Sequence, residues 1–201
     1  MAVCNLYRMT DASAAVADLF RAVELGASNA GAEVYPGYPG LVVAGGAVRS
    51  MTWGFPLVLK GKSGQPLKPK PVNNTRADKL DSFMWRYSFE ERRCLIPVTE
   101  FAEAEGEKGA KTRTWFSLPD QPLFAIAGIW RDTPEWGPAY SMMMTEACIH
   151  VVGVHDRMPV ILAPDDWRRW TEGPAGEARE LCVPYAGEMT VTRTADAWVR
   201  R

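Results

Sequence analysis

Short apolar segments broken by turn residues recur along most of this sequence and constrain its fold more than any other feature. They are rich in apolar and β-branched residues and are bounded by Gly, Pro or Asp, as expected for strands. The clearest are Leu41–Ala44, Ala47–Trp53, Arg93–Val98, Arg113–Leu118, Leu123–Trp130 and Ala139–Thr145. Because strands and helices do not alternate as in βαβ units, we predict an α+β fold. Its core would be a curved, mostly antiparallel, barrel-like sheet with flanking helices.

Two segments carry helix signals. Thr10 or Asp11 can cap a helix that ends near Gly26. Its apolar face would contain Val16, Leu19, Phe20 and Val23. Pro164 suits the first turn of a second helix. That helix would carry Trp167 and Trp170.

Lys60–Asn74 is the one long stretch that matches neither pattern. It contains three prolines, which cannot donate in a sheet. Its lysines are Lys60, Lys62, Lys68 and Lys70. We predict a long loop here, either a solvated insertion or one side of a basic groove.

Composition limits the classes of function. A chain of 201 residues that is 47% hydrophobic can bury one substantial core, so we expect a single domain over residues 1–201. The net charge of -1 gives no global basic field, so any nucleic-acid site must be a local patch. No apolar run approaches the ~18–20 residues of a membrane helix, and Arg8 and Asp11 interrupt any secretory leader. A cytoplasmic protein is expected.

The cysteines are dispersed and form no Cys-x-x-Cys pair. They are Cys4, Cys94, Cys148 and Cys182. This spacing favours free thiols over a zinc site or a disulfide framework. We expect no metal and no cofactor.

Cys4 has the most distinctive position of the four. A cysteine that becomes the first residue offers an α-amine and a thiol on adjacent carbons, both partly reactive at neutral pH. An aldehyde can form a Schiff base with the amine, and the sulfur can then close a five-membered thiazolidine ring. An internal cysteine cannot react in this way because its nitrogen is an amide. The alternative is that Cys4 is an ordinary small apolar residue in a first strand.

Two polar motifs follow in the middle of the chain. Asn74 and Arg76 lie in Asn73-Asn74-Thr75-Arg76, which either closes a turn or supplies an amide to hold a nucleophile and a guanidinium to grip a phosphate. Glu103 shares a strand face with Phe101, so both would point inward together. A buried carboxylate has the raised pKa that a general acid needs. The alternation of Glu103 with Glu105 and Glu107 also fits a solvated hairpin edge.

His155 lies in His155-Asp156-Arg157-Met158-Pro159, where the proline favours an extended residue before it. The polar trio therefore precedes the apolar strand 160–162, a place where a scaffold can present catalytic groups. His150 has no such neighbourhood. A single histidine can equally be structural.

Taken in order, these motifs resemble the SOS response-associated peptidase (SRAP) family of abasic-site processing proteins. The matching segments are Cys4–Tyr7, Met51–Gly54, Asn74–Arg76, Arg93–Pro97 leading to Glu103, Thr145–Ala147 and His155–Pro159. They cover nearly the whole chain.

The resemblance implies the SRAP fold and a covalent reaction with abasic sites in single-stranded DNA. It makes Cys4 the nucleophile, Asn74 its support, and Glu103 and His155 the proton-transfer groups. Arg76 and Arg157 would contact phosphates, joined by Lys70 from the basic segment. Trp53 or Phe55 would stack on a base. Such a protein would associate with the nucleoid when bound to DNA.

In the family the cysteine directly follows the initiator methionine, whereas Ala2 and Val3 intervene here. We therefore expect the active protein to carry Cys4 as its first residue. Either translation begins at Val3, or the folded site cleaves the Val3–Cys4 bond itself. Two further functions stay open: a cysteine peptidase in which His155 activates Cys4, and a non-catalytic module that binds single-stranded DNA.

Overall fold

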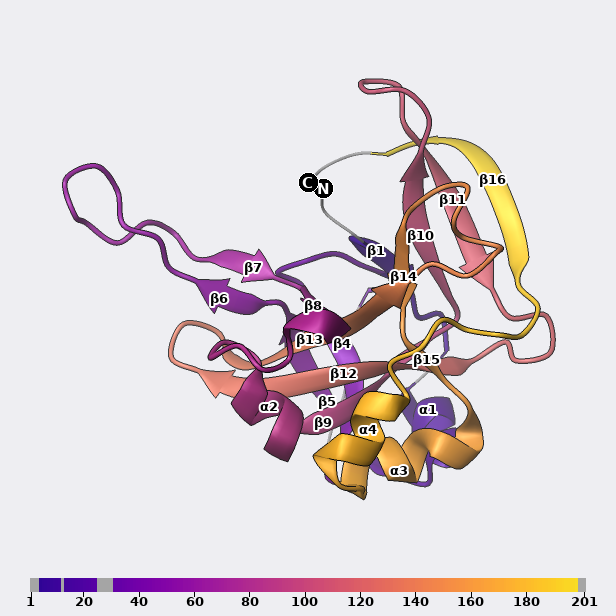
Figure 1. Cartoon of the computed structure of the whole chain (residues 1–201), viewed down its shortest axis with the longest axis horizontal. Coiled ribbons are helices and arrows are strands. Elements are labelled where there is room, and N and C mark those ends of the chain that lie inside the picture. Colours follow the sequence, from indigo (N-terminus) through magenta and orange to yellow (C-terminus); the bar gives the residue numbers. More distant parts are fainter. Residues whose placement is uncertain (1–3, 12, 25–30, 199–201) are drawn as a thin grey trace.

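Five strands close a barrel at the centre of the molecule. The computed structural model describes residues 4–11, 13–24 and 31–198. Around the barrel the strands are β5 (Ala47–Trp53), β4 (Pro39–Ala44), β9 (Arg93–Val98), β12 (Phe124–Thr133) and β13 (Gly137–Glu146). A parallel pairing of β13 with β5, Tyr140 opposite Trp53, completes the ring, and the other neighbours are antiparallel. The predicted barrel-like, mostly antiparallel α+β fold is confirmed (Figure 1).

Short strands extend the barrel sheet. β2 (Val23–Glu24) pairs with β5, β15 (Ile161–Leu162) pairs with β12, and both β8 (Asn74–Arg76) and β14 (Arg157–Pro159) pair with β13. β8 and β14 bring the Asn74 and His155 motifs to the same strand, although about 80 residues of sequence separate them.

A second sheet stands beside the barrel. Its strands, in spatial order, are β16 (Thr190–Ala197), β11 (Thr112–Ser117), β10 (Glu100–Glu105), β1 (Leu6–Arg8) and β3 (Glu33–Val34). The chain passes from β9 of the barrel into β10 through Thr99, whose backbone N–H donates to the Arg8 carbonyl. Because β1 pairs with β10, Cys4, two residues before β1, lies next to Glu103.

The predicted strands agree with the structure to within about three residues at each end, the usual uncertainty of strand ends. The turn between β4 and β5 uses Gly45 and Gly46, both with positive φ (58° and 70°), as a two-residue hairpin of this kind requires. All six residues of β9 are buried, which explains its continuous apolar run.

A buried tyrosine pair constrains the barrel next to β1. The hydroxyls of Tyr7 and Tyr140 lie 2.5 Å apart and share a hydrogen bond. They meet over Gly40, where an added Cβ would lie 2.2 Å from the Tyr7 oxygen and 2.1 Å from the Tyr140 oxygen. A larger residue at position 40 would separate the pair and displace β1.

Helices are short and cover the outside. They are α1 (Ser13–Phe20), α2 (Arg86–Glu91), α3 (Trp167–Glu172), α4 (Ala175–Glu180) and the 3₁₀ turns η1 (Ala77–Lys79) and η2 (Pro164–Asp166). The predicted helix after Pro164 is confirmed as η2 followed by α3. Trp170 is fully buried and donates its indole N–H to the Cys94 carbonyl at 2.9 Å, which attaches α3 to β9.

The predicted first helix is shorter than expected. It ends at Phe20, because Arg21 has a positive φ of 50° and Val23 begins strand β2. Leu19 and Val23 are therefore exposed rather than part of an apolar face. The expected end near Gly26 lies outside the described residues.

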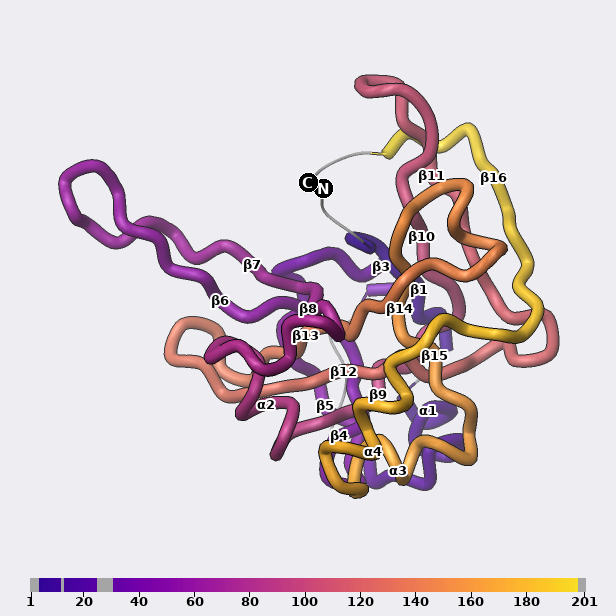
Figure 2. The backbone as a smooth tube through the Cα atoms, viewed as in Figure 1, coloured from indigo at the N-terminus to yellow at the C-terminus, as the bar shows by residue number. Residues whose placement is uncertain are grey.

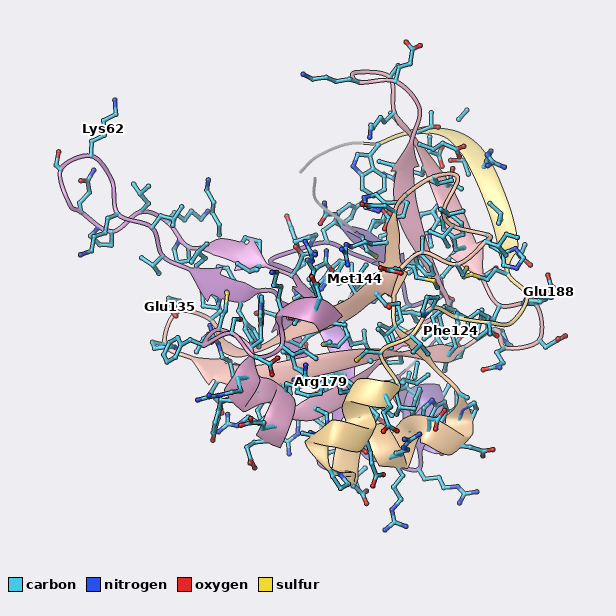
Figure 3. All side chains as sticks on the ribbon, viewed as in Figure 1. Lys62, Phe124, Glu135, Met144, Arg179 and Glu188 are labelled. Atoms are coloured by element: carbon cyan, nitrogen blue, oxygen red, sulfur yellow. The ribbon has the colours of Figure 1, made fainter. Side chains whose placement is uncertain are left out.

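The prediction of a long loop over residues 60–74 is wrong in part. β6 (Phe55–Leu57) and β7 (Lys70–Val72) form a two-stranded ribbon that projects from the barrel as an arm (Figure 2). Pro56 lies opposite Pro71, which a two-stranded ribbon tolerates because each strand has an unpaired edge. Lys62 stands at the far tip of this arm (Figure 3).

Candidate active site

Cys4 is fully buried where the chain enters β1. Its backbone N–H donates to Oε1 of Glu103 at 2.9 Å. Its φ is +33°, in the left-handed region that is costly for a residue with a side chain. Surrounding contacts must hold this conformation. Burial raises the pKa of the Cys4 thiol well above its usual range, and the nearby Glu103 carboxyl raises it further. The thiol is therefore protonated at neutral pH.

Glu103 lies on β10 and is only 2% exposed. It shares its strand face with the fully buried Phe101, as the alternation predicts. Burial raises the pKa of this carboxyl to about 8, against the lowering effect of the Cys4 N–H. Glu105, two residues on, is instead half-buried and pairs with Arg193 at 2.9 Å. Glu103 can therefore gain or lose a proton close to neutral pH.

Two side-chain amides hold the Cys4 carbonyl. Nδ2 of Asn74 donates to this oxygen at 3.0 Å, and Nδ2 of Asn73 donates to it at 3.1 Å. Asn73 also reaches the side-chain oxygen of Asn5 at 3.1 Å. Together with Glu103 these contacts fix both sides of the Cys4 backbone, which explains how its left-handed conformation persists.

His155 ends the short turn that leads into β14. Its Nδ1 accepts the backbone N–H of Arg157 at 3.0 Å, which places the proton of the neutral ring on Nε2. Burial lowers the pKa of His155, so the ring is neutral at neutral pH. Asp156 Oδ1 lies 2.9 Å from the same Nδ1 and opposes the lowering of the pKa. The ring is thus a donor through Nε2, and Asp156 stabilises it when a second proton arrives.

Glu103 and His155 line one pocket of about 860 Å³. This volume falls within the range of about 300–1,000 Å³ that is usual for ligand sites. Asn5 also lines the pocket. The remaining lining comes from β10, the β10–β11 turn and the end of β16: Ala104, Lys108, Gly109, Ala110, Lys111, Thr112, Ala195, Ala197 and Trp198.

The two predicted phosphate-binding arginines converge on one carboxylate. Arg76 grips Asp78 with two hydrogen bonds, Nε to Oδ1 at 2.9 Å and Nη2 to Oδ2 at 2.6 Å. Arg157 Nη1 lies 4.0 Å from Asp78 Oδ1. β8 and β14 both pair with β13, which brings these side chains together from distant parts of the sequence. Lys70 is exposed at the start of β7, on the arm.

The sequence profile of the family described as SOS response associated peptidase (SRAP) matches residues 3–199. The chain belongs to this family. The match covers all the residues discussed above, including both segments that β13 brings together.

Alignments with relatives of similar sequence cover a smaller part of this SRAP chain than the family profile does. It is 32% identical over 103 residues to the abasic site processing protein YoqW of Bacillus subtilis (strain 168), an alignment that spans 48% of this chain and 46% of the relative. The abasic site processing protein YoaM of the same organism is also 32% identical over 103 residues, spanning 48% of this chain and 45% of its own. The chain thus spans less than half the length of these relatives.

Solved structures share the SRAP fold over nearly the whole chain. A protein from Bordetella bronchiseptica has a TM-score of 0.79 at 21% identity and covers 95% of this chain and 99% of its own. A protein from Bacteroides thetaiotaomicron has a TM-score of 0.77 at 19% identity, with 94% and 91% coverage. At these identities the likeness shows the fold alone.

The predicted stacking role of Trp53 or Phe55 needs correction. Both side chains are fully buried, so neither ring offers a face to a DNA base. Trp53 donates its indole N–H to the Asn73 carbonyl at 3.0 Å and therefore supports the residue that holds Cys4. The Phe55 ring carries the guanidinium of Arg131 at 4.2 Å. Both residues belong to the scaffold.

Some site residues escape sequence reasoning. Asn73 adjoins Asn74 and makes the same contact, so the Asn-Asn pair was the available signal. Lys111 and Trp198 have no such signal, because only strand pairing between β11 and β16 brings them to the pocket.

Metal and membrane features are absent from what the structure describes. Over residues 4–11, 13–24 and 31–198, no group of three or more His, Cys, Asp or Glu side chains is arranged to hold a metal ion. Within the same ranges, no helix has the length and apolar character needed to cross a bilayer.

Proposed function

We propose that the protein captures abasic sites in single-stranded DNA by covalent reaction of Cys4 with the aldehyde of the ring-opened sugar. The observation that carries this proposal is the 2.9 Å contact between the Cys4 nitrogen and the buried carboxyl of Glu103. It places the first nucleophilic atom against a group that exchanges protons near neutral pH. The names of the Bacillus relatives, abasic site processing proteins, support abasic sites as the substrate.

The first bond joins the α-nitrogen of Cys4 to the aldehyde carbon. The nitrogen lone pair adds to the carbonyl, giving a carbinolamine, and loss of water then leaves a protonated imine whose nitrogen keeps one hydrogen. At neutral pH Glu103 is largely protonated. One of its carboxyl oxygens can accept a hydrogen bond from the nitrogen while the other gives its proton to the departing hydroxyl. The carboxyl ends this step ionised.

The second bond closes the thiazolidine ring. The Cys4 sulfur adds to the imine carbon, and the electrons of the C=N bond return to nitrogen. Because burial keeps the thiol protonated, its proton must leave during the attack. The ionised Glu103 can take this proton, while the nitrogen keeps its own proton and becomes the ring amine, which balances the step and restores the protonated carboxyl.

His155 suits an earlier event, the opening of the sugar ring. Its neutral form carries the proton on Nε2, and it lines the same pocket as Glu103. When doubly protonated, this ring can give its Nε2 proton to the sugar ring oxygen while the C1 hydroxyl loses its proton to water, so that the closed sugar converts to the aldehyde and His155 returns to its neutral form. The contact with Asp156 stabilises the charged ring whenever it holds two protons.

Phosphates flanking the lesion would bind Arg76 and Arg157. A guanidinium matches phosphate oxygens in the way that Arg76 now matches the two oxygens of Asp78. DNA would displace the Asp78 carboxylate from this pair. Lys70 on the arm would extend the same positive surface.

The chemistry requires a free α-amine on Cys4, since an amide nitrogen cannot become an imine nitrogen. Residues 1–3 lie outside the description of the structure, so the route to that amine stays a prediction. A start at Val3 and cleavage of the Val3–Cys4 bond by the folded site both meet the requirement.

A cysteine peptidase fits the geometry less well. Such enzymes use a thiolate activated by an adjacent histidine. Among the described residues, the hydrogen-bond contact of the Cys4 sulfur is with the Leu6 carbonyl at 3.9 Å, not with His155. The thiol is also buried and protonated.

A gel assay with an abasic single-stranded oligonucleotide tests the proposal. Protein that begins at Cys4 should give a heat- and detergent-resistant shifted band, while an intact oligonucleotide or a reduced, aldehyde-free analogue should not react. Cys4→Ser should give no stable product, because oxygen closes a more labile ring. Adducts on the reduced analogue would exclude the aldehyde mechanism.

A further inference from the structure

Part of the pocket wall has no task in the reaction just described. Lys108 and Lys111 lie at the β10–β11 turn, and Trp198 follows β16. β11 and β16 run side by side, so these residues meet at one end of the second sheet (Figure 2). They line the same pocket as Glu103 and His155.

The position of Trp198 is fixed relative to Lys111. Its backbone N–H donates to the Lys111 carbonyl at 2.7 Å. Its half-buried side chain packs against the small apolar cluster of Leu6, Ala102 and Trp115. Leu6 is two residues from Cys4, so the ring is supported by the strand that also carries the nucleophile.

Lys111 is close enough to affect both proton-transfer groups. Burial raises the pKa of Glu103 and lowers the pKa of His155. The nearby Lys111 ammonium lowers the pKa of both groups. An ammonium in this position attracts an anion into the pocket. The neighbouring lining is small, with Ala110, Ala195 and Ala197, and leaves room for a flat group.

We propose that Lys108, Lys111 and Trp198 form a nucleotide subsite next to the abasic sugar. The base of the adjoining nucleotide stacks on Trp198, and the phosphate that links it to the abasic sugar pairs with Lys111, supported by Lys108. The inference rests on the proposed function, because it takes single-stranded DNA as the substrate.

Single-strand sites combine a positive groove with aromatic platforms, and this wall supplies both. Trp53 and Phe55 are fully buried, so neither can stack on a base, whereas Trp198 lines the pocket. An abasic sugar has no base and would fill only part of this pocket. A sugar together with one neighbouring nucleotide matches the space better.

Equilibrium binding of the full chain to an aldehyde-free abasic oligonucleotide tests the subsite without a covalent step. Fluorescence anisotropy over a series of salt concentrations would give Kd and its salt slope. Trp198→Ala should weaken binding roughly 5- to 150-fold, the range for base stacking on an aromatic ring, and Trp198→Phe should restore most of it. Lys111→Gln should flatten the salt slope by about 0.7, the value for one phosphate contact on a single strand.

The controls separate this inference from the proposed function. Arg168→Gln removes one charge from α3, outside this pocket, and should leave both quantities unchanged. Thermal melts check that the Trp198 variants fold. If wild-type protein crosslinks abasic DNA while Trp198→Ala and Lys111→Gln bind as tightly as wild type, the subsite is wrong and the proposed function stands. If the chain beginning at Cys4 forms no adduct, the proposed function itself fails.

Discussion

The two halves of the candidate site are built differently. Around Cys4 the contacts are buried or half-buried: Glu103 and the two asparagine amides fix the backbone before any substrate is present. In the other half Arg76 and Asp78 are exposed and Arg157 is half-buried, and both guanidinium groups are directed to Asp78 of the same chain. Under the proposed function, one half is ready for chemistry, whereas the other would exchange a partner when DNA binds.

This difference follows from what each half has to do. A reacting atom gains from fixed geometry and low dielectric, which also shifts the pKa of Glu103 toward neutrality. A phosphate site gains from exchange, because exposed ion pairs contribute little to stability and can be replaced at little cost. Substitutions in the buried half should therefore change rates and stability, and substitutions in the exposed half should change binding.

The largest effect is expected for Glu103→Gln, which keeps the shape but removes the exchangeable proton. Crosslinking should slow roughly 10²- to 10⁴-fold if Glu103 is the general acid–base group. The wild-type rate should fall as pH rises through about 8, where this carboxyl loses its proton, and the variant should lack that step. Single-turnover rates between pH 6 and 9 provide the measurement. Glu105→Gln is the matched control, and equal rates for Glu103→Gln and wild type would remove Glu103 from the mechanism.

His155→Ala tests the other proton-transfer group, with a loss in the same range of roughly 10²- to 10⁴-fold. If His155 acts in sugar opening, the loss should appear with an abasic sugar, which is mainly closed. It should be small with an acyclic aldehyde that needs no opening. Equal losses on both substrates would contradict that assignment.

Glu103→Gln should also make the protein more stable at neutral and alkaline pH. In the unfolded chain this carboxyl ionises near pH ~4.3, whereas the folded protein holds the proton up to about pH 8. Unfolding releases a proton in that window, so wild-type stability should fall with pH by up to about 1.4 kcal/mol per unit. Urea unfolding at pH 5, 6, 7 and 8 would show this slope in wild type and in Glu105→Gln, but not in Glu103→Gln. If Glu103→Gln keeps the wild-type slope, a group other than Glu103 causes the pH dependence of stability.

In the exposed half, Arg76→Ala and Arg157→Ala should weaken DNA binding while leaving the single-turnover rate at saturating DNA close to wild type. Each loss should flatten the salt slope of binding by about 0.7. Arg193→Ala, which removes a charge paired with Glu105, serves as control. A reduced rate at saturating DNA with unchanged binding would mean that the arginine acts in the reaction rather than in binding.

The smallest effect is expected for Asp78→Asn, which removes the internal competitor for both arginines. Binding of single-stranded DNA should become at most a few-fold tighter, because an exposed ion pair such as this one competes only weakly. Weaker binding would mean that Asp78 positions the arginines rather than occupying their site.

Much of the fold was predictable because local patterns agree with it. β5 and β9 match their predicted ranges, since a glycine turn and a continuous apolar run define them. The arm was missed because the prolines within residues 60–74, Pro71 among them, argue against strands, and only the pairing of Pro71 with Pro56 in a two-stranded ribbon resolves the conflict. The buried state of Trp53 follows from closure of the barrel, which no local signal reports.

The candidate site divides in the same way. Glu103 could be placed from its strand alternation with Phe101, because that rule is local. The meeting of Arg76 with Arg157 depends on two strands joining β13 from distant parts of the chain. Lys111 and Trp198 depend on the pairing of β11 with β16. Single-sequence patterns carry no information on such long-range pairings.

The most direct test of the central claim compares two preparations that differ only before Cys4. One begins at Cys4 with a free α-amine, and the other keeps residues 1–3, so that the same nitrogen is an amide. Intact-mass measurement after reaction with abasic single-stranded DNA should show the first as protein plus DNA minus one water, and the second unmodified wherever residues 1–3 remain attached. Equal adduct formation by protein whose mass shows that residues 1–3 are still attached would contradict the role assigned to the Cys4 nitrogen and its contact with Glu103.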